Sequence, residues 1–207
     1  NIEGGFVVSC VAGPDSFGYK KTYLGDHIID KAIKYALRDK NYITYPFEPI
    51  GSDERQYSSP AFKIPTSTIT KSKYYEYDEY HTSLDNLDFI SPSNLKKTLG
   101  VYLKAIYYLE YNQKYKRKFN ECEFMLSKID GMYPSTGGTI SQPSVVKNHI
   151  NHKYTSENNG RILDCISWLS FGCDGNNSLF EIQEMSNLPL DDLIHSVNIL
   201  KSKKLIK

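Results

Sequence analysis

The sequence predicts an α/β domain followed by a smaller, mainly helical domain. An apolar run at residues 5–12, "GFVVSCVA", is typical of a buried strand. Residues 25–40 carry apolar residues at helical spacing, and β-branched residues return at 64–70. Strand, helix, long loop, strand, loop and helix follow one another, which is the order of an α/β fold. After about residue 159 the patterns indicate helices.

The first helix is predicted within "GDHIIDKAIKYALRDK", because apolar pairs recur along one face. Asp26 stands where an N-cap would accept the first free N–H groups. Residues 42–65 look too irregular to form an element, and "IPTSTIT" at 64–70 predicts a second core strand. A second helix is expected to begin with Ser91 as N-cap and Pro92 as its first residue. Its apolar face is expected to consist of Leu95, Leu99, Leu103 and Ile106.

We therefore expect three regions: an α/β domain at 1–115, an irregular connecting segment at 116–158, and a small helical domain at 159–207. The connecting segment contains "NHINHK", whose His149 and His152 we expect in a solvated loop. The sequence pattern of the last region predicts three helices, spaced as in a helix-turn-helix. "KKLI" at 203–206 stands where a winged-helix domain begins its wing.

Composition narrows the function classes. Lys and Arg number 25 against 24 Asp and Glu, so no overall field directs the chain to nucleic acid, and we expect no nucleic-acid partner. No apolar run approaches the roughly 18 residues of a membrane span, and no signal peptide opens the sequence. Cys10, Cys122, Cys165 and Cys173 form no zinc-binding pattern, which favours a reducing cytoplasm.

His81 in "DEYHTSLDN" is a candidate metal ligand, although a single histidine in a polar loop is more often solvated. Two neighbours support the ligand interpretation. The phenol of Tyr80 can donate a hydrogen bond to a developing oxyanion, and Asp85 can accept the second ring N–H of His81.

The loop "GSDERQY" at 51–57 holds a second cluster. Asp53 and Glu54 could act as metal partners or proton carriers. Equally, Asp53 could cap a turn while Glu54 and Arg55 form an exposed ion pair. Both long loops flank one predicted strand, and ligands bind beyond the carboxyl ends of strands in α/β folds, so the loops could converge.

Together, "GSDERQY" and "EYHTSLDN" resemble motifs of the co-catalytic zinc aminopeptidase fold. More closely, they resemble its bacterial aminopeptidase-like branch, associated with polysaccharide biosynthesis and carrying a C-terminal winged-helix domain. The resemblance covers residues 1 to about 115 and the last fifty or so, with "GMYPSTGG" between them. It implies a three-layer α/β/α domain, of which this chain holds the C-terminal part, followed by the winged helix.

The resemblance also implies zinc as cofactor and roles for individual residues. His81 stands at the last metal ligand, Tyr80 at a donor to the tetrahedral intermediate, and Asp53 at an acid that borders the metal centre. Cys10, in "VVSCVAG", stands where relatives have an aspartate ligand; a thiolate can bind zinc, but a small buried cysteine is an equal alternative. Glu54 stands where the wider fold has histidine.

A co-catalytic centre needs about five protein ligands and a general base. The remaining ligands have no counterpart in this sequence, and the chain opens without Met, so it looks like the C-terminal portion of a protein about twice as long.

The leading hypothesis is a zinc-dependent hydrolase of aminopeptidase type that cleaves a peptide or amide bond, including a sugar-linked amide. The fragment alone is expected to be inactive. The alternatives are a degenerate binding protein of the same fold and a winged-helix regulatory or nucleic-acid-binding module. The winged helix is expected to pack or to bind protein, including a second copy of the chain.

Overall fold

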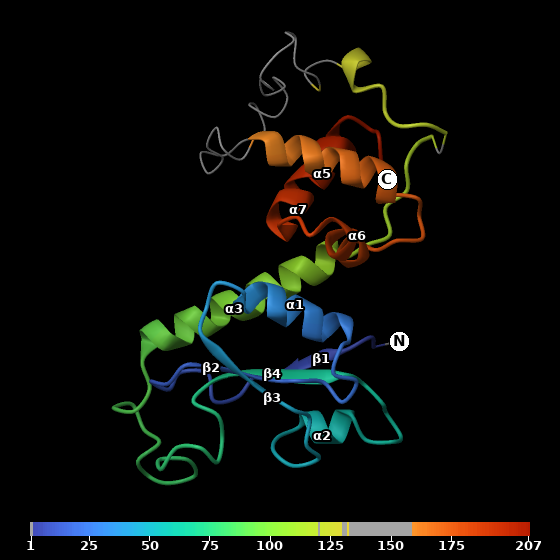
Figure 1. The fold of residues 1–207 in the computed structure, drawn as a ribbon. Helices are drawn as coiled ribbons and strands as arrows, with labels where there is room; N and C mark the ends of the chain where they lie inside the picture. Colours follow the sequence, from blue (N-terminus) through green and yellow to red (C-terminus); the bar gives the residue numbers. More distant parts are fainter. Residues whose placement is uncertain (1, 120, 130–131, 133–158) are drawn as a thin grey trace. The chain divides into compact units, whose positions relative to one another are not determined.

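The computed structural model describes residues 2–119, 121–129, 132 and 159–207, and the chain forms two compact units, Asn1–Glu110 and Tyr111–Lys207. Unit 1 is α/β and unit 2 is mainly helical, as predicted (Figure 1). Within these described residues, no helix is both long and apolar enough to cross a bilayer.

A four-stranded mixed sheet forms the centre of unit 1. Its strands are β1 (Gly5–Val7), β2 (Phe17–Lys20), β3 (Tyr42–Tyr45) and β4 (Thr66–Lys71), in the spatial order β1-β4-β2-β3. β1 runs parallel to β4 and β2 parallel to β3, whereas β2 and β4 are antiparallel. Every residue of β4 is buried, which agrees with its β-branched sequence.

Two helices, α1 (Ile28–Leu37) and α3 (Pro92–Tyr111), cover one face of the sheet, and the single turn α2 (Glu54–Tyr57) lies against the other (Figure 1). Tyr102 of α3 joins two strands, because its hydroxyl lies 2.9 Å from the carbonyl oxygens of Val7 and Ile69 and accepts the N–H of Ile69 at 2.9 Å.

The predicted helix at 25–40 is confirmed, but its predicted cap is wrong. His27, not Asp26, is the N-cap of α1, and its side chain accepts the N–H of Ile29. Asp30 completes a capping box by accepting the N–H of His27 at 2.9 Å. The fully buried Asp30 carboxylate also accepts from Thr22 N–H at 2.9 Å and from the Tyr19 hydroxyl, which ties α1 to the end of β2.

The predicted start of α3 is confirmed, since Pro92 is its first residue and the Ser91 hydroxyl accepts the N–H of Asn94 at 3.1 Å. Its predicted apolar face is wrong. Leu95, Leu99, Leu103 and Ile106 are 48%, 54%, 57% and 44% exposed. The packed face instead uses Thr98, Val101, Tyr102, Ala105 and Tyr108. The hydroxyl of Tyr102 is hydrogen-bonded to β1 and β4 on the packed face, whereas the leucines line an open apolar groove with Phe6 and Val8.

Other sequence predictions for unit 1 were incomplete. The strand expected at 5–12 ends at Val7, although the carbonyl of Cys10, which has a positive φ of 50°, still accepts the N–H of Lys71 at the end of β4 at 2.7 Å. β2, β3 and α2 were not predicted. Residues 42–65, expected to be irregular, contain the last two of these elements.

Unit 2 contains the three predicted helices, α5 (Asn159–Gly172), α6 (Leu179–Ser186) and α7 (Leu190–Ser202), and a short 3-10 turn, η1 (Leu126–Lys128). Ser178 and Glu181 form a capping box at the start of α6. The core of the unit is aliphatic: Ile162, Ile166, Leu169, Leu179, Ile182, Leu193, Val197 and Leu200 are all fully buried.

Residues 112–118 pack within unit 2, although the sequence placed the domain boundary at 115. Lys116 pairs with Asp174 and Arg117 with Ile206 through isolated antiparallel bridges. The segment that follows α7 thus meets residues 116–117 at the position where the wing was expected. His149, His152 and all of "GMYPSTGG" except Met132 lie outside the described residues.

Buried and exposed leucines of unit 1 should differ in the stability that is lost when they are replaced by alanine. Leu37→Ala removes a fully buried side chain from α1 and should lower the free energy of unfolding by about 2–5 kcal/mol. Leu103→Ala acts on a side chain that is 57% exposed and should cost less than about 1 kcal/mol. Both costs can be measured by urea denaturation and then by hydrogen exchange of the β4 amides. Equal costs would contradict the open position of Leu103.

Candidate functional site

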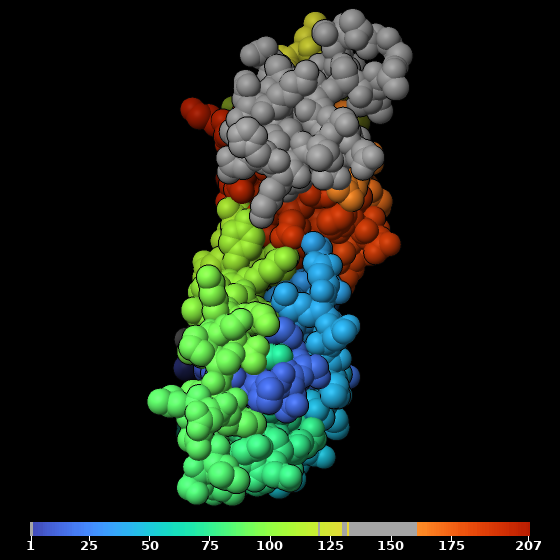
Figure 2. Space-filling view, turned by 90° about the vertical axis from the view of Figure 1, so that its left-hand side faces the viewer, coloured from blue at the N-terminus to red at the C-terminus, as the bar shows by residue number. Residues whose placement is uncertain are grey.

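A pocket of about 520 Å³ lies in unit 1 where the segment after β1 meets the loop between β4 and α3. The two segments lie side by side (Figure 2), and Ser91 N–H donates to the carbonyl of Ala12 at 3.0 Å. Four of the six residues singled out in the sequence line this pocket: Cys10, Tyr80, His81 and Asp85.

Cys10 faces the tyrosine-rich loop. The Tyr77 hydroxyl lies 3.6 Å from its Sγ, and the Ser9 hydroxyl lies at the same distance. Burial, followed by the hydrogen bond and the charge of Cys10, raises the pKa of Tyr77 well above its usual value. Tyr77 therefore remains a protonated donor at neutral pH.

Tyr80 and His81 stack on each other, with ring centroids 4.0 Å apart and an interplanar angle of 15°. Burial, reinforced by Tyr75 and Cys10, raises the pKa of Tyr80, so its phenol also keeps its proton. Asp85 lines the same pocket, but within the described part of the chain its carboxylate makes no hydrogen bond to His81.

The candidate ligands stand on unusual backbone. His81 has φ 57° and Cys10 has φ 50°, both in the left-handed region that L-residues rarely adopt. Such conformations cost on the order of 1 kcal/mol or more each and are frequent at functional sites. The turns at Cys10 and His81 bring both side chains to the pocket at the expense of backbone strain.

Lys71 is a pocket residue that the sequence interpretation missed. It is the last residue of β4, it is 8% exposed, and its Nζ donates to the carbonyl of Asp15. Burial and the nearby Lys97 lower its pKa. Lys71 thus adds a cationic side chain to the lining of the pocket. A lysine at the end of a strand carries no local signal of burial, and only the packing shows it.

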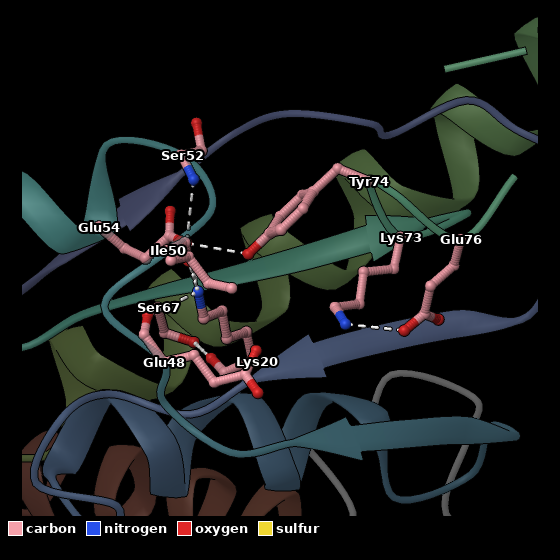
Figure 3. A network of polar contacts seen from close by, with 9 residues as sticks. All are labelled: Lys20, Glu48, Ile50, Ser52, Glu54, Ser67, Lys73, Tyr74 and Glu76. Carbon is pink, nitrogen blue, oxygen red and sulfur yellow. Dashed lines mark hydrogen bonds and ion pairs between the residues drawn. The ribbon is translucent and has the colours of Figure 1, made fainter. Parts of the chain in front are cut away.

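Glu54 has a different environment from the one its motif suggested. Its carboxylate is fully buried and forms an ion pair with Lys20, with 2.8 Å between Nζ and Oε1 (Figure 3). Lys20 Nζ also donates to the carbonyls of Glu48 at 3.1 Å and Ile50 at 2.6 Å. The Tyr74 hydroxyl donates to the same Glu54 oxygen at 2.9 Å.

Burial alone would raise the pKa of Glu54, but the hydrogen bonds from Lys20, the backbone and Tyr74 together hold it below its usual value. Gly51 is needed beside this network, because φ is 121° and a Cβ there would lie 2.6 Å from the Tyr74 hydroxyl. Glu54 therefore anchors the "GSDERQY" loop. Asp53 is exposed and its side chain caps no N–H, while Ser52 is the residue of this loop that lines the pocket.

The described residues do not form a complete metal centre. Among them, no three or more His, Cys, Asp or Glu side chains lie close enough to hold one ion. Structural and catalytic zinc sites use at least three protein ligands. Cys10 and His81 could supply at most part of such a set.

Comparison with known proteins adds three similarities. Residues 1–112 match the protein family described as "Domain of unknown function (DUF4910)". A Clostridium acetobutylicum protein, described as a candidate polysaccharide biosynthesis protein with aminopeptidase-like domain, is 32% identical over 211 residues, covering 100% of this chain and 44% of that protein. The crystal structure of a candidate peptidase from the same organism matches with TM-score 0.75 and 30% identity, covering 100% of this chain and 42% of that one. The chain thus spans less than half the length of these relatives.

The buried ion pair predicts a large cost for neutralising Glu54. Glu54→Gln leaves Lys20 buried without its counter-charge, so the free energy of unfolding should fall by about 3 kcal/mol. Glu76→Gln is the matched control, because Glu76 pairs with Lys73 at 2.7 Å (Figure 3) but is 45% exposed, and it should cost less than about 1 kcal/mol. Denaturation of both variants at neutral pH measures the difference, and similar values would contradict the anchoring role.

The same pair predicts a pH dependence. The folded pKa of Glu54 is lowered from 4.5, so the stability it contributes is complete above that value and is lost as pH falls through the folded pKa. The wild-type chain should therefore lose stability more steeply than Glu54→Gln as the pH is lowered below 4.5. Unfolding curves recorded across this range test the sign, and parallel curves would count against it.

Proposed function

The chain belongs to the family described as "Domain of unknown function (DUF4910)", and we propose that it supplies part of the active site of a peptidase-type hydrolase. The observation that carries this proposal is the pocket that gathers Cys10, Tyr80 and His81 from segments distant in sequence. The aminopeptidase-like and peptidase descriptions of the two relatives support the same class. Because the chain spans less than half the length of these relatives, the activity, substrate and partners of a protein of their length are also proposed.

The pocket offers hydrogen-bond donors to an amide substrate. Tyr77 and Tyr80 carry phenolic protons at neutral pH, as tyrosines ordinarily do, and Lys71 adds a positive charge. A carbonyl oxygen gains negative charge when the amide carbon is attacked, and fixed donors stabilise that charge in a site of low dielectric. We assign Tyr80 to this task, as the resemblance to zinc aminopeptidases implies.

Zinc is the cofactor that this resemblance implies, with His81 and Cys10 as ligands from this chain. The described residues alone do not complete its coordination, so further ligands would have to come from outside these residues. Asp53 and Glu54, proposed from the sequence as catalytic, do not line the pocket, and Glu54 is occupied by Lys20 and Tyr74.

A degenerate protein of the same fold is the second candidate, since cysteine stands where the relatives' fold has an aspartate ligand. Such a protein would bind the peptide or amide without hydrolysing it. For unit 2 we propose a winged-helix-like module that contacts protein. The first turn of α7 carries Asp191 and Asp192, of which Asp192 pairs with Arg161 at 3.2 Å, and carboxylates at this end of the helix disfavour a DNA phosphate.

Tyr80→Phe tests the catalytic proposal in a protein of the relatives' length that contains these residues. Loss of one oxyanion donor should lower kcat/KM for an aminoacyl p-nitroanilide by about 100-fold. Tyr75→Phe is the control, because Tyr75 contacts Tyr80 at 5.0 Å between ring centroids but is 68% exposed and lies outside the pocket lining. Hydrolysis that is equally sensitive to both changes would contradict the assignment.

The chain by itself should hold no stoichiometric zinc after dialysis and should not hydrolyse the same substrate when zinc is added, because the ligand set of its described residues is incomplete. Elemental analysis per chain and release of p-nitroaniline measure the two properties. Zinc-dependent release of an N-terminal amino acid by this chain alone would show that the described residues suffice.

A further inference from the structure

Unit 2 contains a cavity of about 620 Å³ that is separate from the pocket described above. Its volume lies within the range of about 300–1,000 Å³ typical of small-molecule sites. Cationic side chains dominate its lining: Lys116, Arg117, Lys118, Lys201, Lys204 and Lys207. Glu121 is the acidic residue among the described lining residues.

This accumulation of charge is local. The whole chain carries 25 Lys and Arg against 24 Asp and Glu, so an average surface would balance cations with acids. Within the described residues, none of the six cations forms an ion pair with a carboxylate side chain. Several lie over aromatic rings instead: Lys201 Nζ is 4.7 Å from the Tyr115 ring centre and the Arg117 guanidinium is 4.7 Å from that of Phe124. Uncompensated like charges repel one another, and an anion would relieve that cost.

Backbone hydrogen bonds join the two chain segments that carry these cations. Lys116 and Lys207 exchange N–H to carbonyl hydrogen bonds at 3.0 and 2.9 Å, and Lys118 N–H donates to Leu205 at 2.9 Å. Alternate residues of an extended segment point to the same side, so Lys116 and Lys118 share one face. The turn after α7 requires φ 56° at Lys204, and it returns the chain toward this segment.

The negative end of the α7 dipole explains a lysine at position 201, but it does not explain Lys116 or Lys118, which come from another segment. The cavity also exposes an aromatic ring, because Phe119 is 60% exposed and lies 5.6 Å from Lys118 Nζ. A ring beside several cations suits a ligand that joins a flat heterocycle to phosphate groups.

We propose that this cavity binds a nucleoside diphosphate, with the pyrophosphate held by the lysines and the base stacked on Phe119. A small ligand is favoured over duplex nucleic acid because the charge fills one cavity, while the start of α7 carries Asp191 and Asp192. The inference is independent of the hydrolase proposed for unit 1.

Isothermal titration of the intact chain with UDP, ADP and inorganic pyrophosphate tests the proposal. We expect one saturable site, tighter for a nucleoside diphosphate than for inorganic pyrophosphate, and weakening between about 50 and 200 mM salt. The double variant Lys118→Gln and Lys201→Gln should bind all three ligands at least about tenfold more weakly, since each substitution removes a charged contact. Lys114→Gln is the matched control, because it belongs to the same basic run but does not line the cavity.

The variant Phe119→Leu tests the contribution of the base to affinity separately from that of the pyrophosphate. It should reduce nucleoside diphosphate affinity to that of inorganic pyrophosphate and leave pyrophosphate binding unchanged. Absence of saturable binding, equal affinities for all three ligands in the wild type, or binding that Lys114→Gln weakens as much as the double variant would overturn the proposal. Binding confined to single-stranded oligonucleotide or to an acidic polysaccharide would overturn it as well. Circular dichroism of each variant confirms that unit 2 remains folded.

Discussion

The ion pair between Lys20 and Glu54 is the constraint on which the loops of unit 1 depend. Removing both charges from water costs several kcal/mol, and the carbonyls of Glu48 and Ile50 offset part of this by accepting from the same ammonium. Tyr74, at the start of the pocket loop, donates to the same carboxylate. One contact thus joins β2, the "GSDERQY" loop and the loop that carries the pocket tyrosines. Buried pairs of this kind define geometry more than they add net stability.

The sequence predicted correctly those elements whose own residues indicate that they are buried or capped. β4 is β-branched and fully buried, and the predicted cap at Ser91 is a local hydrogen bond. β2 was missed because "FGYK" is four residues long and ends in Lys20, whose burial depends on a partner 34 residues away. The apolar face of α3 was misassigned for the opposite reason: spacing identifies a stripe of leucines, but not which side of a helix the sheet contacts.

The site was predictable to the extent that motif order reflects three-dimensional proximity. Cys10, Tyr80 and His81 do meet in one pocket. Glu54 lies in the "GSDERQY" motif and yet anchors its loop, because Oε1 of its buried carboxylate accepts from Lys20 and Tyr74 and the residue does not line the pocket. Burial and partners, rather than residue type, distinguish a chemical group from a structural one, and neither can be obtained from a single sequence.

The two cavities differ in the kind of donor they present, and this difference limits their ligands. In unit 1, Tyr77 and Tyr80 are neutral donors, and Lys71 is the one cationic side chain among the described lining residues. Neutral donors suit a carbonyl oxygen that is uncharged on binding and becomes negative during reaction. The cavity of unit 2 presents permanent positive charge from six side chains, which suits a ligand already ionised in water. A phosphate-rich ligand would therefore prefer the second cavity, and an amide the first.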